Sequence, residues 1–421
     1  MKKLLLLIAI IFACVFSFSS CNTRDNTRDN IRDGVIYEIS EIGDYAVVVG
    51  YEGDISQVEI ASEFKGKPVQ KITDYAFDFC GSIASVVIPD SVTSIGEFAF
   101  WLCTSLTSVV ISDSVTSIGN GAFYACYSLT SVVIPDSVTS LGDNTFYSCI
   151  SLNSVVIGNS VTSIGDSAFY NCNSLAKITV DENNECYKSI DGNLYTKDGK
   201  QLIQYAIGKT DTDFHIPDSV TNIGDYAFLG CASLSSLVIG NNVTRIGDDA
   251  FFGCDSLVSA LIGNNVASIG NDAFSQCESL EEINVDENNE YYKSVYGNLY
   301  TKDGKQLIKY ASGKTATEFT IPNSVTSIED RALACADSLN SVVIPDSVTS
   351  IGDVAFYACD SLNSVVIPDS VTSIGNDVFS NCDCLTDIYY GGSEAEWNDV
   401  SNYSFDGALS NKVTVHYNYK G

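Results

Sequence analysis

"SVVIPDSVTSIG", Ser85–Gly96, occurs again at Ser341–Gly352 and at Ser364–Gly375. Near copies are Ser131–Gly142 (SVVIPDSVTSLG) and Ser108–Gly119 (SVVISDSVTSIG). The β-branched run SVVI predicts a strand, the Pro-Asp or Ser-Asp step after it predicts a corner, and SVTSIG predicts a second, shorter extended piece. One phrase copied this often indicates a stack of one supersecondary unit.

Cysteines give the period of the repeat. They are 23 residues apart at Cys80, Cys103, Cys126, Cys149 and Cys172, and the spacing resumes at Cys231, Cys254 and Cys277. We place Cys335, Cys359 and Cys382 in the same series. A fixed period of this size is typical of a solenoid, in which each coil buries its apolar side against its neighbours. In the segment GAFYAC we expect a turn or a short helical segment, with Phe123 and Cys126 pointing inward.

The whole pattern, L-x-S-V-V-I-P-D-S-V-T-S-I-G-x-x-A-F-x-x-C, runs from about Ile72 to Leu385. It resembles the BspA-like, or Treponema pallidum-type, leucine-rich repeat of surface proteins. The resemblance implies a repeat solenoid: a right-handed superhelix of 23-residue coils with a parallel β-sheet on its concave side. One copy differs: we interpret Ile328–Cys335 (IEDRALAC) as a residue short and lacking the Phe, so we expect a local defect there.

Two stretches interrupt the period. DENNECYKSIDGNLYTKDGKQLIQY starts at Asp181 and DENNEYYKSVYGNLYTKDGKQLIKY at Asp286, 105 residues later, so a larger unit has been duplicated. An Asp-Gly turn between alternating arms predicts β-hairpins at Asn193–Tyr205 and Asn298–Tyr310, which we expect to project from the regular coil. The runs DENNE lack a calcium-loop pattern and predict solvated turns.

The two ends of the chain differ from the repeats. Basic MKK followed by apolar LLLLIAIIFACVF predicts an export signal, and Phe18-Ser19-Ser20-Cys21 resembles a bacterial lipobox, which implies lipidation of Cys21. Ordinary secretion with cleavage nearby is the alternative. The predicted organisation is a lipoprotein signal peptide (1–20), a flexible tether (21–34), an N-terminal β-rich cap (35–70), the solenoid (71–384, with inserts at about 181–216 and 286–321) and a C-terminal β-rich cap (385–421).

Composition and motif spacing argue against several classes of function. With 22 Lys and Arg against 53 Asp and Glu, the net charge of −31 is wrong for binding nucleic acid. The two histidines, His215 and His416, are far apart and near no recognisable nucleophile motif, so we expect no enzyme. One Cys per coil lacks metal-ligand spacing, and we expect neither a metal nor a cofactor.

The repeated cysteines are expected to be buried free thiols. Strands in neighbouring coils are about 4.8 Å apart, whereas the Cβ atoms of a disulfide are about 3.8 Å apart. Small buried thiols pack as apolar side chains. Cys186 and Cys384 lie outside the repeat and are the cysteines we expect to react or pair.

The candidate binding surface is the outward side of the strands. Side chains alternate along a strand, so if Val109 and Ile111 point inward, Val110 points outward. The same reasoning selects an apolar set, with serines beside it on the same face: Val87, Val110, Val133, Val156, Val238, Leu261, Val343 and Val366, with Ser108, Ser131 and Ser154. We expect a regular, almost uncharged concave face, and an exposed apolar stripe of this kind marks an interaction site. The alternative is that valines are there because they favour strands.

These observations predict a non-enzymatic, exported lipoprotein of the outer membrane or cell surface. We expect a monomer attached to the membrane only by its N-terminal lipid. Its partner would be a macromolecule, a protein of the host or matrix, and the resemblance implies adhesion or host interaction. The alternatives are a structural spacer or envelope scaffold, and a glycan-binding accessory protein, against which the stripe offers only Tyr389 for stacking on sugars.

Overall fold

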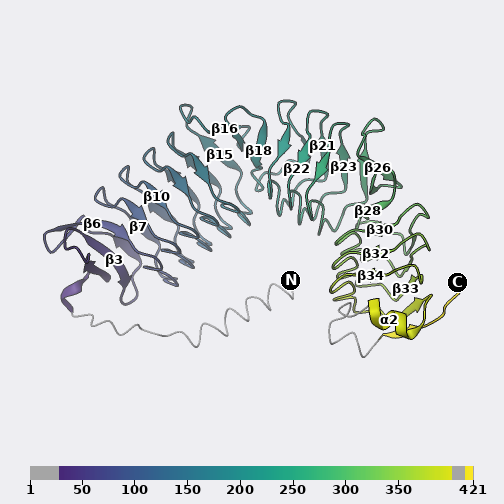
Figure 1. Ribbon diagram of the computed structural model, residues 1–421. Coiled ribbons are helices and arrows are strands. Elements are labelled where there is room, and N and C mark those ends of the chain that lie inside the picture. Colours follow the sequence, from purple (N-terminus) through teal and green to yellow (C-terminus); the bar gives the residue numbers. More distant parts are fainter. Residues whose placement is uncertain (1–27, 401–412, 421) are drawn as a thin grey trace.

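The computed structural model describes residues 28–400 and 413–420. Its coils stack into an arc that runs from the strands labelled β3 and β6 to the helix labelled α2 (Figure 1). The predicted signal peptide, Cys21 and the first half of the predicted tether (21–27) lie outside the described residues. Each regular coil contributes a longer strand, a short strand and a turn, and the strands of successive coils pair in parallel. The predicted solenoid is confirmed.

The longer strands form four parallel sheets along the arc, ordered β4-β7-β9, β11-β13-β15, β19-β21-β23-β25 and β29-β31-β33-β35-β36. Equivalent residues of the repeat face one another across each pair of strands, as Val133 faces Val156. The bounds of these strands are β4 (Gln57–Glu59), β7 (Ser85–Val87), β9 (Ser108–Val110), β11 (Ser131–Ile134), β13 (Ser154–Ile157), β15 (Lys177–Val180), β19 (Asp213–His215), β21 (Ser236–Ile239), β23 (Ser259–Ile262), β25 (Glu282–Val285), β29 (Glu318–Thr320), β31 (Ser341–Val343), β33 (Ser364–Ile367), β35 (Asp387–Tyr390) and β36 (Thr414–His416).

The short strands form a second set of parallel ladders. Each comes from the end of SVTSIG, where the Ile or Leu points into the core, as Ile118 does. Their bounds are β6 (Lys67–Ile72), β8 (Ser94–Ile95), β10 (Ser117–Ile118), β12 (Ser140–Leu141), β14 (Ser163–Ile164), β20 (Asn222–Ile223), β22 (Arg245–Ile246), β24 (Ser268–Ile269), β30 (Ser327–Ile328), β32 (Ser350–Ile351) and β34 (Ser373–Ile374).

The turn that follows each short strand closes the core. Phe123 and Cys126 are fully buried, as predicted. The Phe123 ring stacks between those of Phe100 and Phe146, with ring centroids 5.3 Å and 5.5 Å away. The turn residues three and seven positions after the short-strand Ile have left-handed backbone, for example Phe98 and Leu102 after Ile95. Each coil is thus packed and hydrogen-bonded to the next rather than to itself alone.

The coil at Ile328 corrects the interpretation of the sequence. It has the full length of a regular coil, because Leu333 occupies the Phe position and Ala336 the Cys position, both buried. The Sγ of Cys359 donates to the carbonyl oxygen of Leu333, just as the Sγ of Cys126 donates to that of Phe100. Cys335 therefore lies one residue off the ladder and is half-buried. A β-strand ladder continues through this coil from β28 to β32, so the expected defect is absent.

Each insert is a three-stranded antiparallel meander, one strand more than the predicted hairpin. The first comprises β16 (Tyr187–Ile190), β17 (Asn193–Thr196) and β18 (Gln201–Gln204), and the second β26 (Tyr292–Val295), β27 (Asn298–Thr301) and β28 (Gln306–Lys309). The Asp-Gly turns are where the sequence predicts them. The hairpins do not simply project, because β18 and β28 pair in parallel with β20 and β30 and so replace the short strand of a coil.

The DENNE runs are only in part the solvated turns that we expected. Asp181 accepts from the backbone N–H of exposed Asn183, which is a solvated turn. Asn184, in contrast, is fully buried. Its Nδ2 donates to the carbonyl oxygens of Gly158 and Val161, and its Oδ1 accepts from two backbone N–H groups of the insert. Asn289 makes the same four bonds in the second insert. A side chain amide that uses all its hydrogen-bonding capacity in this way attaches each insert to the coil before it.

The ends of the solenoid are covered by short β elements. At the N-terminal end a 3-10 turn (Arg28–Asn30) leads into β1 (Ile31–Arg32), β2 (Val35–Ile39) and β3 (Ala46–Tyr51), which pair antiparallel, and β3 then pairs in parallel with β6. Strand β5 (Glu63–Phe64) pairs antiparallel with β6. At the other end α2 (Glu394–Val400) buries Trp397 against Tyr390. Within the described residues no helix has the length and apolarity to span a bilayer.

Candidate functional site

We use the term valine–serine face for the outward side of the longer strands. The alternation along each strand is as expected: Val132 is buried and Val133 exposed. Branched apolar side chains are unusually accessible here, with exposed fractions of 43% for Val87, 57% for Val110, 60% for Val133 and 39% for Val156. Leu261 and Val343 are also exposed, and Val238 and Val366 are half-buried. Ser108 and Ser131 are exposed, and Ser154 is half-buried, on the same face.

The valine–serine face is not the single regular stripe that we expected. The two inserts divide it into three windows, each bounded by polar side chains. The first window is Val87, Val110, Val133 and Val156, the second is Val238 and Leu261, and the third is Val343 and Val366. The bordering strands place Glu59, Thr179, His215, Asn284, Thr320 and Tyr389 at the valine position, and Lys177, Asp213, Glu282, Glu318 and Asp387 at the serine position. Only the first window spans four successive coils without a charged residue at either position.

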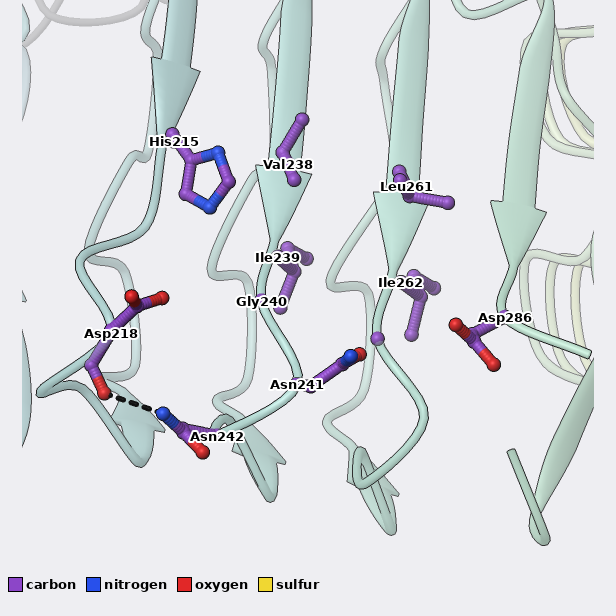
Figure 2. A pocket seen from close by; sticks show the side chains of 11 residues that line it. His215, Asp218, Val238, Ile239, Gly240, Asn241, Asn242, Leu261, Ile262 and Asp286 are labelled. Carbon is purple, nitrogen blue, oxygen red and sulfur yellow. Dashed lines mark hydrogen bonds between the residues drawn. The ribbon is translucent and has the colours of Figure 1, made fainter. Parts of the chain in front are cut away.

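The second window borders a pocket of about 370 Å³ at the ends of β19, β21 and β23. Figure 2 shows His215, Val238 and Leu261 side by side on adjacent strands, above a polar corner. There the Asn242 Nδ2 donates to the carbonyl oxygen of Asp218, at 2.8 Å. Asn241 and Asp286 complete the polar side of the pocket. The pocket has an apolar wall and a wall of amides and carboxylates.

The third window ends at an aromatic cluster contributed by the C-terminal strands. The rings of Tyr389 and His416 stack with centroids 4.7 Å apart, and Tyr419 lies 4.9 Å from Tyr389. A groove of about 700 Å³ runs from Val343 and Val366 to Tyr419. His416 Nε2 lies 2.7 Å from Asp387 Oδ1, and this hydrogen bond lowers the pKa of Asp387. Tyr389, which sequence analysis notes as an isolated aromatic, therefore has two aromatic partners.

The residues of a hydrolytic centre do not converge in the described part of the chain. His215 and His416 lie in different sheets, and the partner of His416 is a carboxylate with no hydroxyl nucleophile in the pair. No group of three or more His, Cys, Asp or Glu side chains with metal-binding geometry is present among the described residues. The two histidines thus contribute to surfaces of the solenoid, at the borders of the second and third windows.

The cysteines separate into two environments. Those on the ladder are buried, and burial raises the thiol pKa of Cys126 and Cys149. Cys186 is half-buried and Cys384 exposed, in line with their position outside the repeat. Cys335 joins them as a half-buried thiol, and burial raises its pKa to about 11. A thiolate is the reactive form, so we expect these buried ladder thiols to react slowly in the folded protein.

Sequence analysis overlooked an aromatic strip on the turn side of the first coils. Trp101, Tyr124, Tyr147 and Tyr170 follow the buried Phe of four successive coils and are half-buried. Tyr124 and Tyr147 stack face to face, with centroids 4.5 Å apart and ring planes 7° apart, and Trp101 meets Tyr124 edge-on. Tyr124 and Tyr147 therefore each cover one face of the other ring. In the sequence, this strip is recognisable as an aromatic residue directly after the buried Phe in each of the four coils.

Comparison with known proteins places the chain in a family. The family model described as "BspA type Leucine rich repeat region (6 copies)" matches residues 70–196, 207–298 and 309–420, which is most of the chain. This protein belongs to the BspA-type leucine-rich repeat family. No curated protein matches it.

Solved structures of bacterial leucine-rich repeat proteins are similar to this chain. A leucine-rich repeat protein from Eubacterium ventriosum is 26% identical, with a TM-score of 0.62, over 84% of this chain and 94% of that one. The pneumococcal vaccine antigen PcpA is 19% identical, with a TM-score of 0.50, over 93% and 98% of the two chains. A leucine rich cell surface protein from Faecalibacterium prausnitzii is 28% identical, with a TM-score of 0.45, over 90% and 98%. The chain thus shares its repeat and its fold with bacterial leucine-rich repeat proteins.

Proposed function

We propose that this protein is an exported, non-enzymatic surface protein that binds another protein through the first window of the valine–serine face. The observation that supports the proposal most strongly is the exposure of Val87, Val110, Val133 and Val156 on four successive coils. Branched apolar side chains in water are unfavourable by roughly 25 cal/mol per Å² of apolar area, which covering by a partner would recover. Contiguous exposed apolar surface is typical of interaction sites.

The kind of partner follows from the chemistry of the window. It offers methyl groups and serine hydroxyls, without an exposed aromatic face for stacking on a sugar. The remainder of the protein is strongly acidic, at −31. A protein with an apolar patch rimmed by polar or basic groups suits this surface, and such a match of charges speeds association. We include adhesion to a host or matrix protein in the proposal, together with lipid attachment through Cys21, which lies outside the described residues.

The experiment is solid-phase binding of the mature chain to a panel of extracellular matrix proteins, with a glycan array beside it. The test variant is V110E/V133E/V156E, which places three carboxylates about 5 Å apart across the window. The matched control is T116E/T139E/T162E, which adds the same charge at exposed positions before the short strands. Thermal unfolding of both variants accompanies the assay, because each threonine hydroxyl also donates to a carbonyl of the preceding coil.

We expect the valine variant to lose binding to a matrix protein and the threonine variant to keep it. If the folded valine variant binds as well as the unmodified chain, the first window is not the site. Binding confined to glycans would favour the accessory-protein alternative. A solenoid that binds neither class would favour a structural spacer.

A further inference from the structure

The first insert leaves a pocket of about 320 Å³ on the turn side of the solenoid. Its cause is a short turn. In a regular coil the buried aromatic residue is five positions after the short-strand Ile, as Phe228 is after Ile223. In the insert, Leu202 pairs with Ile223, and the ring of Tyr205 stacks on that of Phe228. Tyr205 is therefore only three positions after the residue that takes the place of the short-strand Ile. Two turn residues are missing, and the pocket lies where they would be.

The missing residues leave a carboxylate without its usual partner. In neighbouring coils the residue two positions after the short-strand Ile is mostly Asp. Its Oδ1 accepts a hydrogen bond from the backbone N–H of the equivalent residue in the next coil, as Asp143 does from Asp166. The insert has no residue at this position, so no such N–H reaches the carboxylate of Asp166. Among the described residues, no Lys or Arg lies within ion-pair distance of Asp166. Asp225, on the opposite wall of the pocket, pairs with Arg245 at 2.9 Å.

The surroundings of the pocket are negative. The lining residues include Asp166, Asp225 and the amides of Gln201 and Gln204, but no Lys or Arg. Tyr226 also lines the pocket, and burial followed by the carboxylates of Asp249, Asp166 and Asp225 raises its pKa. The pocket thus has the charge and the acceptor groups to receive a cation with several N–H donors.

The duplicated unit shows what fills the equivalent space. Residues 105 positions later are Asp272 in place of Ser167, Lys309 in place of Gln204 and Arg331 in place of Tyr226. The Arg331 guanidinium reaches across the second insert and forms an ion pair with Asp272, which lies 59 residues earlier in the chain. At the second insert, the protein's own arginine therefore occupies the gap that the first insert leaves open.

We propose that the pocket at the first insert binds the guanidinium group of an arginine side chain from a partner polypeptide. Asp166 supplies the charge, and Gln201, Gln204 and Asp225 supply further oxygen acceptors at the pocket walls. A guanidinium presents five N–H donors in a plane, which suits a site with several oxygens better than an ammonium does. This site is on the turn side and is separate from the valine–serine face.

Isothermal titration of the mature chain with N-acetyl-arginine methylamide tests the proposal, with the lysine and citrulline analogues as comparison probes. We expect one saturable site that binds the arginine probe at least tenfold more tightly than the citrulline probe and loses affinity as salt rises. D166N should weaken binding at least tenfold. The matched control is D143N, which removes the same charge one coil away and keeps Oδ1 as an acceptor for Asp166 N–H.

The duplication provides a reciprocal test. S167D/Y226R copies the second junction into the first and should abolish binding of the probe while the protein keeps or raises its melting temperature. N271D/D272S/K309Q/R331Y copies the first junction into the second, because Asn271 and Lys309 stand where the first junction has Asp166 and Gln204, and it should raise the stoichiometry from one site to two. Equal binding of arginine and citrulline, or unchanged binding by folded D166N and S167D/Y226R, would overturn the proposal. V110E/V133E/V156E should bind the probe normally, which separates failure of this site from failure of the first window.

Discussion

The Sγ of Cys126 donates a hydrogen bond to the carbonyl oxygen of Phe100, one coil earlier, at 3.2 Å. The same bond joins Cys149 to Phe123 and Cys172 to Phe146, each at 3.1 Å. Each of these three thiols therefore adds a second donor to a buried carbonyl oxygen that already accepts a backbone N–H in its own coil's turn, as Phe100 does from Cys103. The repeated cysteine is a hydrogen-bonding element of the stack as well as a small apolar side chain.

We predict that the ladder thiols resist alkylation in the folded protein. Iodoacetamide should modify exposed Cys384 first and half-buried Cys186 and Cys335 more slowly. Ladder cysteines such as Cys126 should react only after denaturation, because burial raises their pKa and excludes the reagent. Mass spectrometry of peptides from native and denatured samples measures this. Modification of Cys126 at the rate of Cys384 would contradict it, as would disulfides between adjacent coils in unreduced samples.

Replacing Phe123 with Ala should destabilise the solenoid by about 3–5 kcal/mol. The ring is fully buried between Phe100 and Phe146, so its removal opens a cavity shared by three coils. Chemical denaturation followed by circular dichroism measures the loss. F123L is the matched comparison, because Leu333 already occupies this position in another coil, and it should cost less than F123A. Equal losses for the two variants would argue against a cavity as the cause.

Replacing Asn184 with Ala should cost about 3 kcal/mol or more, because the backbone groups that bind its side chain would be buried without partners. The neighbouring variant N183A removes an exposed amide and should change stability by less than about 0.5 kcal/mol. Hydrogen exchange should show faster opening of β16 in N184A than in N183A. Similar stability of the two variants would mean that the amide does not attach the insert.

Lys309 gives a pH-dependent prediction. Its buried Nζ donates to the carbonyl oxygens of Arg331 and Ala334, and burial lowers its pKa from the ordinary 10.5. A charged Lys309 therefore weakens the fold, by about 1.4 kcal/mol for each unit by which the pKa is lowered. K309Q, which copies Gln204 of the first insert, should be more stable than the unmodified chain at pH 7.

The sign of the pH effect follows from proton binding. Between the lowered pKa and 10.5 the unfolded chain holds a proton that the folded chain has released, so the unmodified protein gains stability as pH rises. The advantage of K309Q should thus be full below the lowered pKa and shrink toward pH 10.5. Urea titrations at pH 7 and pH 9.5 in reductant measure it, with K305Q as the exposed control. An advantage that does not change with pH would rule out the charge as its source.

The parts of this structure that sequence reasoning predicted are those that recur every 23 residues. Phe123 and Val133 each contact the equivalent residue of the next coil, and Cys149 bonds to Phe123 of the coil before, so the period itself contains these contacts. The predicted defect in the coil at Ile328 was wrong because the prediction assumed that Cys335 occupies the Cys position. The core instead holds Leu333 at the Phe position and Ala336 at the Cys position. A repeat is defined by positions in the core, and more than one residue type fits them.

The parts that were missed depend on pairings that occur once or twice. Nothing in DENNE distinguishes the buried Asn184 from the exposed Asn183, because burial follows from how β16 packs on the preceding coil. The ion pair between Arg331 and Asp272 joins residues that only the shortened insert brings together. The division of the valine–serine face into windows is different, because Lys177 and Glu282 lie one 23-residue period after Ser154 and Ser259 and the sequence alone could have shown it.

The bonds between successive coils also determine how this molecule responds to mechanical force. Backbone and thiol hydrogen bonds join each coil to its neighbours, so tension on the two ends loads the outermost coil first. Coils would detach in sequence, and each 23-residue coil would release roughly 80 Å of chain. The meanders β16–β18 and β26–β28, fastened by Asn184 and Asn289, would interrupt this unzipping with two longer steps. A solenoid of this design yields gradually under load and absorbs work along its whole length.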